Sequence, residues 1–206
     1  MSFDLKARTW DIDPEKHERA ALFAEQILII TKGSRINNAF EFGSGTALVS
    51  INLKDRFGQI VLADTSMGML EVVGEKALKE GAGNMILYHL NESNPLESAG
   101  RFDLVYTLLA LHHVKDVEKT FGDFFRILNP GGWLIIGDLV TEDGSFHSND
   151  PDFDGHNGFD PEEMKQRLAA AGFETKYQTF FYTIKREKDS AVKEYPLFIL
   201  GAVKKG

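Results

Sequence analysis

The stretch EFGSGTA, residues 41–47, combines residue types that can hold a charged ligand against bare backbone. Gly43 and Gly45 lack the Cβ atoms that would keep a ligand away from the main chain, and glycine tolerates positive φ. Glu41 precedes them, where a carboxylate can meet an ammonium group but would repel a pyrophosphate. Asp64 follows Gly43 by 21 residues, the spacing at which a carboxylate accepts both hydroxyls of a ribose. These residues predict a ligand with a ribose and a cationic group.

Two other nucleotide-binding loops fit this stretch poorly. The dinucleotide pattern G-x-G-x-x-G would need a third glycine where the chain has Leu48, which disfavours NAD and FAD. A Walker loop needs lysine beside its last glycine, and no lysine lies between Lys32 and Lys54. The sequence therefore excludes ATP bound through such a loop.

Short apolar runs alternate with helical patterns over the first two thirds of the chain. An extended arm is expected to end near Asp11, and Pro14 opens the first helix. Buried parallel strands separated by helices predict a sheet that is covered on both faces. The expected strands are 39–42, 60–63, 85–88, 104–106 and 133–138, and the expected helices are 14–31, 47–57, 67–79 and 117–128.

The last third of the chain has a different pattern. A long polar loop follows residue 138, Asp160 opens a helix that Gly172 ends, and strands are expected at 174–183 and 196–203. These two strands would form an antiparallel hairpin at the sheet edge, joined by the charged stretch 185–194. The predicted fold is α/β, doubly wound, with a mostly parallel seven-stranded sheet. We expect one domain over 1–206, with a lid-forming arm and helix (1–31), a cofactor-binding core (32–138) and a loop, helix and hairpin (139–206).

Composition limits the partners. Lys and Arg number 23 against 31 Asp and Glu, a formal charge of −8, which disfavours nucleic acid. The absence of cysteine excludes disulfides and thiolate metal sites and suits the cytoplasm. The N-terminal residues are charged where a signal peptide would be apolar, and no run reaches the ~18 apolar residues of a membrane span. We expect a cytoplasmic protein with no membrane span, and the sequence leaves its oligomeric state open.

Four stretches, EFGSGTA, VLADTSMGML, FDLVYTLLALHHV and LNPGGWLIIGDL, resemble the ordered motifs of the class I S-adenosylmethionine-dependent methyltransferases. The likeness is to the small, metal-independent members similar to ubiquinone-biosynthesis methyltransferases, and it covers nearly the whole chain. The resemblance implies S-adenosyl-L-methionine as cofactor and S-adenosyl-L-homocysteine as product. It places Glu41, Gly43, Ser44 and Gly45 at the methionine part and Asp64 at the ribose.

The same resemblance assigns the rest of the cofactor site. Asn91 stands where the family often has an acidic residue for the adenine amine, and its side-chain carbonyl can still accept that hydrogen bond. The remaining implied residues are Thr65, Ser66 and Met67 near the adenosine, Leu90 beside Asn91, and Thr107 and Leu108 beside the methyl-bearing sulfur.

His112 and His113 are the candidates for a catalytic base, because histidine titrates near neutrality and the loop after the fourth strand faces the transferred methyl. Adjacent side chains are expected to point apart. No third ligand at a recognised spacing supports a metal site, because Asp116 lies four residues after His112 but the sequence does not establish a helix there. The expectation is metal-independent transfer. The stretch DPDFDG resembles a calcium loop but has Pro161 where glutamate is required. Trp10 is expected to line the site, where its ring could face the sulfonium.

The predicted activity is methyl transfer to a small-molecule acceptor at oxygen, nitrogen or carbon. A base-methylating enzyme would carry an Asn/Asp-Pro-Pro-aromatic motif where this chain has Thr107–Ala110. Two alternatives remain: a binding protein that retains the nucleoside site without transfer activity, and a nicotinamide-dependent oxidoreductase on the same sheet topology.

Overall fold

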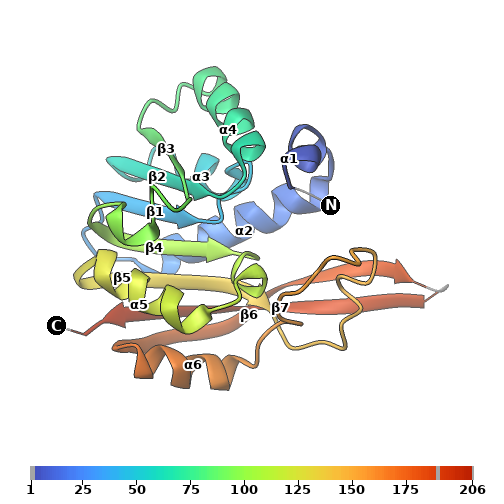
Figure 1. Ribbon diagram of the computed structural model, residues 1–206. Helices are drawn as coiled ribbons and strands as arrows, with labels where there is room; N and C mark the ends of the chain where they lie inside the picture. The colour runs from blue at the N-terminus through green and yellow to red at the C-terminus, as the bar shows by residue number, and fades with distance from the viewer. Residues whose placement is uncertain (1–2, 189–190, 206) are drawn as a thin grey trace.

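The computed structural model describes residues 3–188 and 191–205, and its centre is a seven-stranded sheet with the order β3-β2-β1-β4-β5-β7-β6 (Figure 1). β1 to β5 are parallel, and β7 pairs antiparallel with both β5 and β6. This confirms the predicted doubly wound fold with its antiparallel edge. The strands are β1 (Asn38–Phe42), β2 (Gln59–Asp64), β3 (Met85–His89), β4 (Phe102–Leu108), β5 (Leu128–Leu139), β6 (Phe173–Lys188) and β7 (Ala191–Lys204).

Helices cover both faces of this sheet because its central strands are apolar on both sides. On one face α2 (Pro14–Ile30), α3 (Leu48–Ile51) and α4 (Met67–Lys79) enclose a core that includes Phe23 and Leu62. On the other face α5 (Val117–Ile127) and α6 (Pro161–Ala170) enclose a core that includes Phe40 and Phe124. Order reverses between β1 and β4, so a crevice opens at their carboxyl ends.

Side-chain caps begin the helices at the predicted positions. Asp13 accepts a hydrogen bond from the amide of Glu15 at 3.0 Å and precedes Pro14, the first residue of α2. Asp160 accepts from the amide of Glu162 at 2.7 Å in the same way for α6. These caps satisfy amides that have no partner within the helix.

The N-terminal arm is helical, so the expectation of an extended arm was wrong. It forms α1 (Phe3–Lys6) and the 3₁₀ helix η1 (Ala7–Ile12). Asp4, Arg8 and Asp11 all contact the α4 side of the molecule: Asp4 accepts from the amide of Gly68, Arg8 pairs with Glu75, and Asp11 pairs with Lys76. Spacings of four and three residues place these side chains on one face only when the backbone winds as a helix.

The helix expected over 47–57 is much shorter than predicted. α3 ends at Ile51, and the chain continues in tight turns, with the amide of Leu53 bonded to the carbonyl of Ser50 at 2.9 Å. At the start, Ala47 has a left-handed φ of 60° and no side-chain cap. A helix of one turn presents few aligned amides to a ligand, so main-chain groups of the preceding loop carry that role.

The hairpin strands are longer than predicted, because the charged stretch 185–194 continues the ladder. Lys185 lies opposite Glu194 in the register, and the two side chains form an ion pair of 2.9 Å. Opposite charges placed across a strand pair support pairing where apolar residues are missing. The hairpin therefore extends past the parallel strands, alongside the loop that follows β5 (Figure 1).

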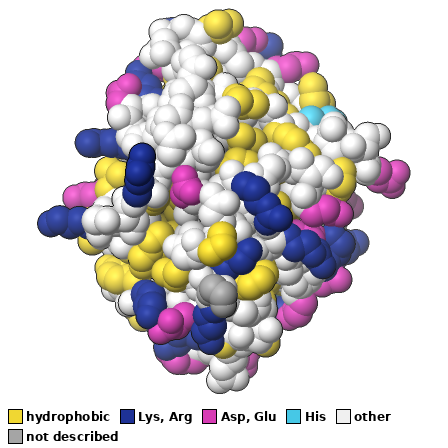
Figure 2. All heavy atoms as spheres, turned by 90° about the vertical axis from the view of Figure 1, so that its left-hand side faces the viewer, with side chains coloured by type: hydrophobic (Ala, Val, Ile, Leu, Met, Phe, Trp, Pro, Cys, Tyr) yellow, Lys and Arg dark blue, Asp and Glu magenta, His cyan; other side chains and the backbone are white. Residues whose placement is uncertain are grey.

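The face that carries the amino ends of the strands mixes positive, negative and hydrophobic side chains (Figure 2). It shows no continuous region of one charge sign. Among the described helices, none combines the length and the apolar character that crossing a bilayer requires.

Candidate nucleoside and acceptor site

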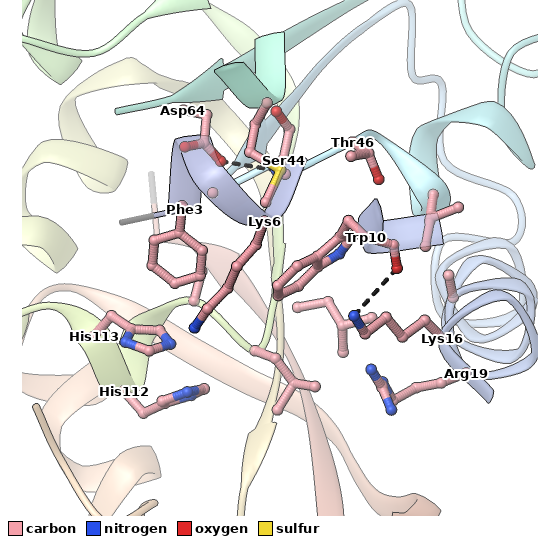
Figure 3. A pocket seen from close by; sticks show the side chains of 18 of the residues that line it. Phe3, Lys6, Trp10, Lys16, Arg19, Ser44, Thr46, Asp64, His112 and His113 are labelled. Carbon is pink, nitrogen blue, oxygen red and sulfur yellow. Dashed lines mark hydrogen bonds between the residues drawn. The ribbon is translucent and has the colours of Figure 1, made fainter. Parts of the chain in front are cut away.

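A cavity of about 820 Å³ opens at the carboxyl ends of β1, β2 and β4. Asp64 and Ser44 lie at one end and His112 and His113 at the other, with the ring of Trp10 between them (Figure 3). Pockets of this size hold small ligands and cofactors. A ligand and a second reactant therefore have room to lie end to end.

The loop after β1 requires glycine for two different reasons. Gly43 has φ +66°, and a Cβ there would lie 2.4 Å from the Cβ of Ala110, well inside contact distance. Gly45 has φ +51°, but a Cβ there would meet only the indole nitrogen of Trp10, at 4.0 Å. The first glycine allows two loops to pack, and the second leaves an open cradle beneath Trp10.

Asp64 is fixed by main-chain amides. Its Oδ2 accepts from the amide of Gly45 at 2.8 Å, and its Oδ1 accepts from the amide of Ser66 at 2.8 Å. Burial raises the pKa of Asp64, while these amides and that of Thr65 act in the opposite direction. The carboxylate is thus held rigidly at the end of β2 and keeps lone pairs for a ligand hydroxyl.

Glu41 is a buried carboxyl group at the same end of the cavity. It is 3% exposed and accepts a hydrogen bond from the hydroxyl of Ser50, which lies 2.5 Å from the hydroxyl of Tyr106. Burial raises the pKa of Glu41 to about 8, and the negative charge of Asp64 adds to this rise. A cationic group beside Glu41 would favour its ionised form.

The structure places most predicted cofactor residues in the cavity wall and four outside it. The residues in the wall are Glu41, Gly43, Ser44, Gly45, Asp64, Thr65, Leu90 and Leu108. Ser66 caps α4 and donates its hydroxyl hydrogen to Asp4, Met67 is 47% exposed, and Thr107 is fully buried within β4. None of these three, nor Asn91, is among the residues that line the cavity.

Asn91 makes hydrogen bonds within its own loop. Its Oδ1 accepts hydrogen bonds from the amides of Ser93 at 2.9 Å and Asn94 at 3.0 Å, which closes a turn. Its amide nitrogen contacts His89. The carbonyl oxygen expected to serve an adenine is thus engaged within its own loop, as is typical of asparagine in turns.

Trp10 lines the cavity as expected, but a lysine covers one face of its ring. Nζ of Lys16 lies 3.6 Å from the ring centroid and donates to the carbonyl of Trp10 at 3.1 Å. The hydroxyl of Thr46 donates to Asp11 at 2.5 Å, which ties the arm to the glycine loop. The arm thus covers the cradle at Gly45.

The two adjacent histidines do not point apart, contrary to expectation. Their ring centroids are 4.2 Å apart, and Nδ1 of His112 donates to Oδ1 of Asp138 at 2.6 Å. His147, from the loop after β5, completes a group in which one ring nitrogen from each histidine lies within 4.8 Å of the others. A third imidazole therefore stands beside the pair, 34 residues after His113, at a distance in sequence that no short motif reveals.

Basic side chains border the same end of the cavity and were not foreseen. Arg19 lies 5.9 Å from the ring of Tyr182 and, within residues 3–188 and 191–205, makes no hydrogen bond or ion pair. Burial lowers the pKa of Arg19. Arg186 stacks 3.7 Å from the ring centroid of Phe146 and donates to its carbonyl at 2.6 Å. They come from α2 and β6, so only the tertiary fold brings them together.

The donor groups of the wall fit an adenosyl amino acid. The hydroxyl oxygen of Ser44 is buried and has no hydrogen-bond partner in the described part of the chain, which is uncommon without a ligand. Beside it stand the buried carboxyl of Glu41, the amide-bound carboxylate of Asp64 and the open cradle at Gly45. This set can hold an amino-acid group and a ribose in sequence.

The fold is doubly wound, and this wall carries groups that can hold a nucleoside. Residues 40–136 match the family model described as a methyltransferase domain. An uncharacterised methyltransferase of Schizosaccharomyces pombe is 30% identical over 138 residues, 60% of this chain and 49% of that protein. A demethylmenaquinone methyltransferase of Bacteroides fragilis is 33% identical over 86 residues, 41% of this chain and 35% of that protein. This part of the chain therefore matches a methyltransferase domain, and the chain spans half or less of these two relatives.

Solved structures share the fold at low identity. A chain of the Haloferax volcanii complex between the Trm112 methyltransferase activator and a methyltransferase superimposes with a TM-score of 0.76 at 15% identity, covering 100% of this chain and 98% of that one. The N-methyltransferase NodS of Bradyrhizobium japonicum, solved with S-adenosyl-L-homocysteine, gives 0.69 at 12% identity, covering 95% and 90%.

Proposed function

We propose that the protein transfers the methyl group of S-adenosylmethionine to a small-molecule acceptor by in-line displacement. The observation that carries the proposal is one continuous cavity with a nucleoside wall at Asp64 and a polar wall at His112 and His113. When bound, the cofactor supplies an electrophilic methyl group on sulfur. The remaining task is to align an acceptor atom with the carbon–sulfur bond and to exclude water.

The residues of the chain have distinct roles in this proposal. Asp64 accepts the ribose hydroxyls, Glu41 and Ser44 hold the amino-acid group, and Leu108 borders the sulfur. The arm with Trp10 covers the reacting atoms. His112 and His113 line the acceptor end, where a separate general base is optional because a sulfonium methyl is already activated.

We further propose that the acceptor is negatively charged. Arg19 carries its charge at the cavity wall without a described partner, and Arg186 and Lys6 border the same space. A partly buried cation is costly unless an anion compensates it. A carboxylate or phosphate on the acceptor would supply that anion.

The proposal is tested by incubating the purified protein with S-adenosylmethionine that carries a tritiated methyl group, together with fractions of a metabolite extract separated by charge. Transfer of label to an anionic fraction, with formation of S-adenosylhomocysteine, is expected. Binding of S-adenosylhomocysteine without transfer to any fraction would instead favour the inactive binding protein. Binding of NADH with no binding of S-adenosylhomocysteine would favour the oxidoreductase.

A further inference from the structure

Three histidines converge at the acceptor end of the cavity. His112 and His113 belong to η3 (Leu111–His113), and His147 lies in the loop after β5. The ring of His147 is 5.1 Å from each of the other two rings, and one nitrogen from each imidazole falls within 4.8 Å of the others. All three side chains line the cavity, so a ligand of this group would be in reach of the second reactant.

The first ring of the group is oriented by a carboxylate. Asp138, fully buried at the end of β5, accepts from Nδ1 of His112 and from its backbone amide, at 2.6 and 3.2 Å. The nitrogen that remains on His112 is Nε2. A histidine that binds a metal through one nitrogen and donates the other N–H to a carboxylate is the usual arrangement at metal sites.

The third ring is held as firmly, although it comes from a loop. His147 stacks on Phe153 at 3.8 Å with an interplanar angle of 11°. The preceding residue, Phe146, is fixed through its amide by Glu142 and through its carbonyl by Arg186. The loop thus presents the imidazole in one orientation, which a ligand set requires.

Nε2 of His147 is buried and has no hydrogen-bond partner among the described residues. A buried polar atom without a partner costs about 1–3 kcal/mol, so such atoms are rare unless a ligand or ion completes them.

We propose that His112, His113 and His147 bind one divalent transition-metal ion, with Zn²⁺ the best fit, through one ring nitrogen each. Nitrogen ligands of a tetrahedral zinc ion lie about 3.3 Å apart, given bonds of about 2.0–2.1 Å, so small side-chain rotations close the site. Three histidines with a fourth position open to the cavity form the ligand set of catalytic rather than structural zinc. The proposal goes beyond methyl transfer and departs from the metal-independent reaction expected from the sequence.

The surroundings indicate what the open position would take. Arg186 and Lys6 lie near His147 as positive charges and Asp150 as a negative one, and the charge of the ion itself would favour an anionic oxygen or sulfur ligand at the open position. A hydroxyl or thiol bound to such an ion has a lowered pKa. The site would therefore both position the acceptor and favour its ionised form.

The test is direct metal binding by the full chain, without an affinity tag that contains histidine. Protein stripped with a chelator and dialysed is titrated with Zn²⁺ by calorimetry, and with Co²⁺ while the visible spectrum is recorded. We expect one ion per chain and visible absorption typical of four- or five-coordinate Co²⁺. His147→Ala should weaken Zn²⁺ binding at least about a hundredfold, and Asp138→Asn about ten- to a hundredfold.

His156→Ala is the matched control, because His156 lies in the same loop but its Nε2 contacts the carbonyl of Val114, at 3.0 Å. It should keep one ion per chain with unchanged affinity. Equal affinity in the wild type, His147→Ala and His156→Ala, or no stoichiometric binding by the wild type, would overturn the proposal. Binding of S-adenosylhomocysteine, measured on the same metal-free samples, checks that each variant is folded and tests the proposed function separately.

Discussion

Two carboxyl groups of the nucleoside wall differ because their surroundings differ. The amides of Gly45, Ser66 and Thr65 all act on Asp64, whereas, of the residues that the structure describes, Ser50 alone donates hydrogen bonds to Glu41, which is otherwise enclosed by the core. Hydrogen bonds from amides stabilise a negative charge, and burial opposes it. Asp64 can therefore accept hydrogen bonds from a ligand, whereas the ionisation of Glu41 would respond to a nearby cation.

Replacing Asp64 by asparagine should remove much of the affinity for the nucleoside. The uncharged side chain accepts weaker hydrogen bonds from ribose hydroxyls, a loss of about 1.5–3 kcal/mol, or about ten- to a hundredfold in Kd. Calorimetry with S-adenosylhomocysteine measures the change. Asp55→Asn, on the exposed turn after α3, is the control and should bind as the wild type does.

Glu41→Gln should alter how stability depends on pH. The folded-state pKa of about 8 exceeds the usual 4.5, so the folded protein retains a proton that the unfolded chain loses between these values. The contribution of Glu41 to the free energy of unfolding is therefore present below pH 4.5 and falls by about 1.4 kcal/mol per pH unit as pH rises toward 8. In denaturant unfolding at pH 5, 6, 7 and 8, the free energy of unfolding of the variant should rise relative to that of the wild type at each step. A constant difference across this series would contradict the buried, protonated carboxyl.

Gly43→Ala should destabilise the ligand-free protein by about 1–3 kcal/mol, because the new methyl group meets Ala110 and the backbone has positive φ. Adding Ala110→Gly should restore part of this loss by removing the atom it meets. Gly83→Ala, where a Cβ would meet nothing within 4 Å, provides the comparison and should change stability by less than about 1 kcal/mol. Thermal and denaturant unfolding of the wild type and the three variants decides the point.

The sequence allowed prediction of those site residues that follow strands in a fixed pattern. Gly43 and Gly45 lie in the loop that follows β1, and Asp64 is the last residue of β2, so local order determines where they lie. The role predicted for Asn91 stays a prediction, because a side chain that suits a ligand also suits its own turn. His147, Arg19 and Arg186 were missed because loops and elements far apart in sequence bring them together.

At the scale of elements, the N-terminal arm is a segment that contacts both ends of the cavity, the glycine loop through Asp11 and His113 through Phe3. Its predicted backbone was wrong because the sequence shows no apolar helical period there. Polar contacts at Asp4 and Asp11 fix its winding instead. The sheet was predicted correctly because its strands are apolar runs bounded by turns, a pattern that can be recognised without knowing which strands pair.

Asp11→Asn should loosen this arm. Asp11 accepts a hydrogen bond from Thr46 of the glycine loop and pairs with Lys76 of α4 at 2.6 Å, so its side chain links the arm, the glycine loop and α4. Faster amide hydrogen exchange over residues 3–12 is expected, together with a severalfold higher Kd for S-adenosylhomocysteine. Glu75→Gln removes only the exposed pair with Arg8, which is worth little, and should leave both values nearly unchanged.

At the scale of the whole molecule, ligand binding should appear as thermal stabilisation. S-adenosylhomocysteine at a hundred times its Kd should add about 2.7 kcal/mol, which raises the Tm of a chain of this size by about 5 to 11 °C. NADH at the same concentration should leave Tm unchanged. The opposite ranking would contradict the absence of a pyrophosphate loop at 43–48.

The long hairpin has a consequence for how this architecture can vary. The residues proposed for the nucleoside all precede position 110, whereas His147 and Arg186 belong to the loop after β5 and to β6. A chimera could exchange residues 140–159 and the far half of the hairpin with those of a relative. Its acceptor preference would therefore change, while the residues proposed to bind the nucleoside would stay the same. New specificities in this architecture can thus arise through recombination of its last third.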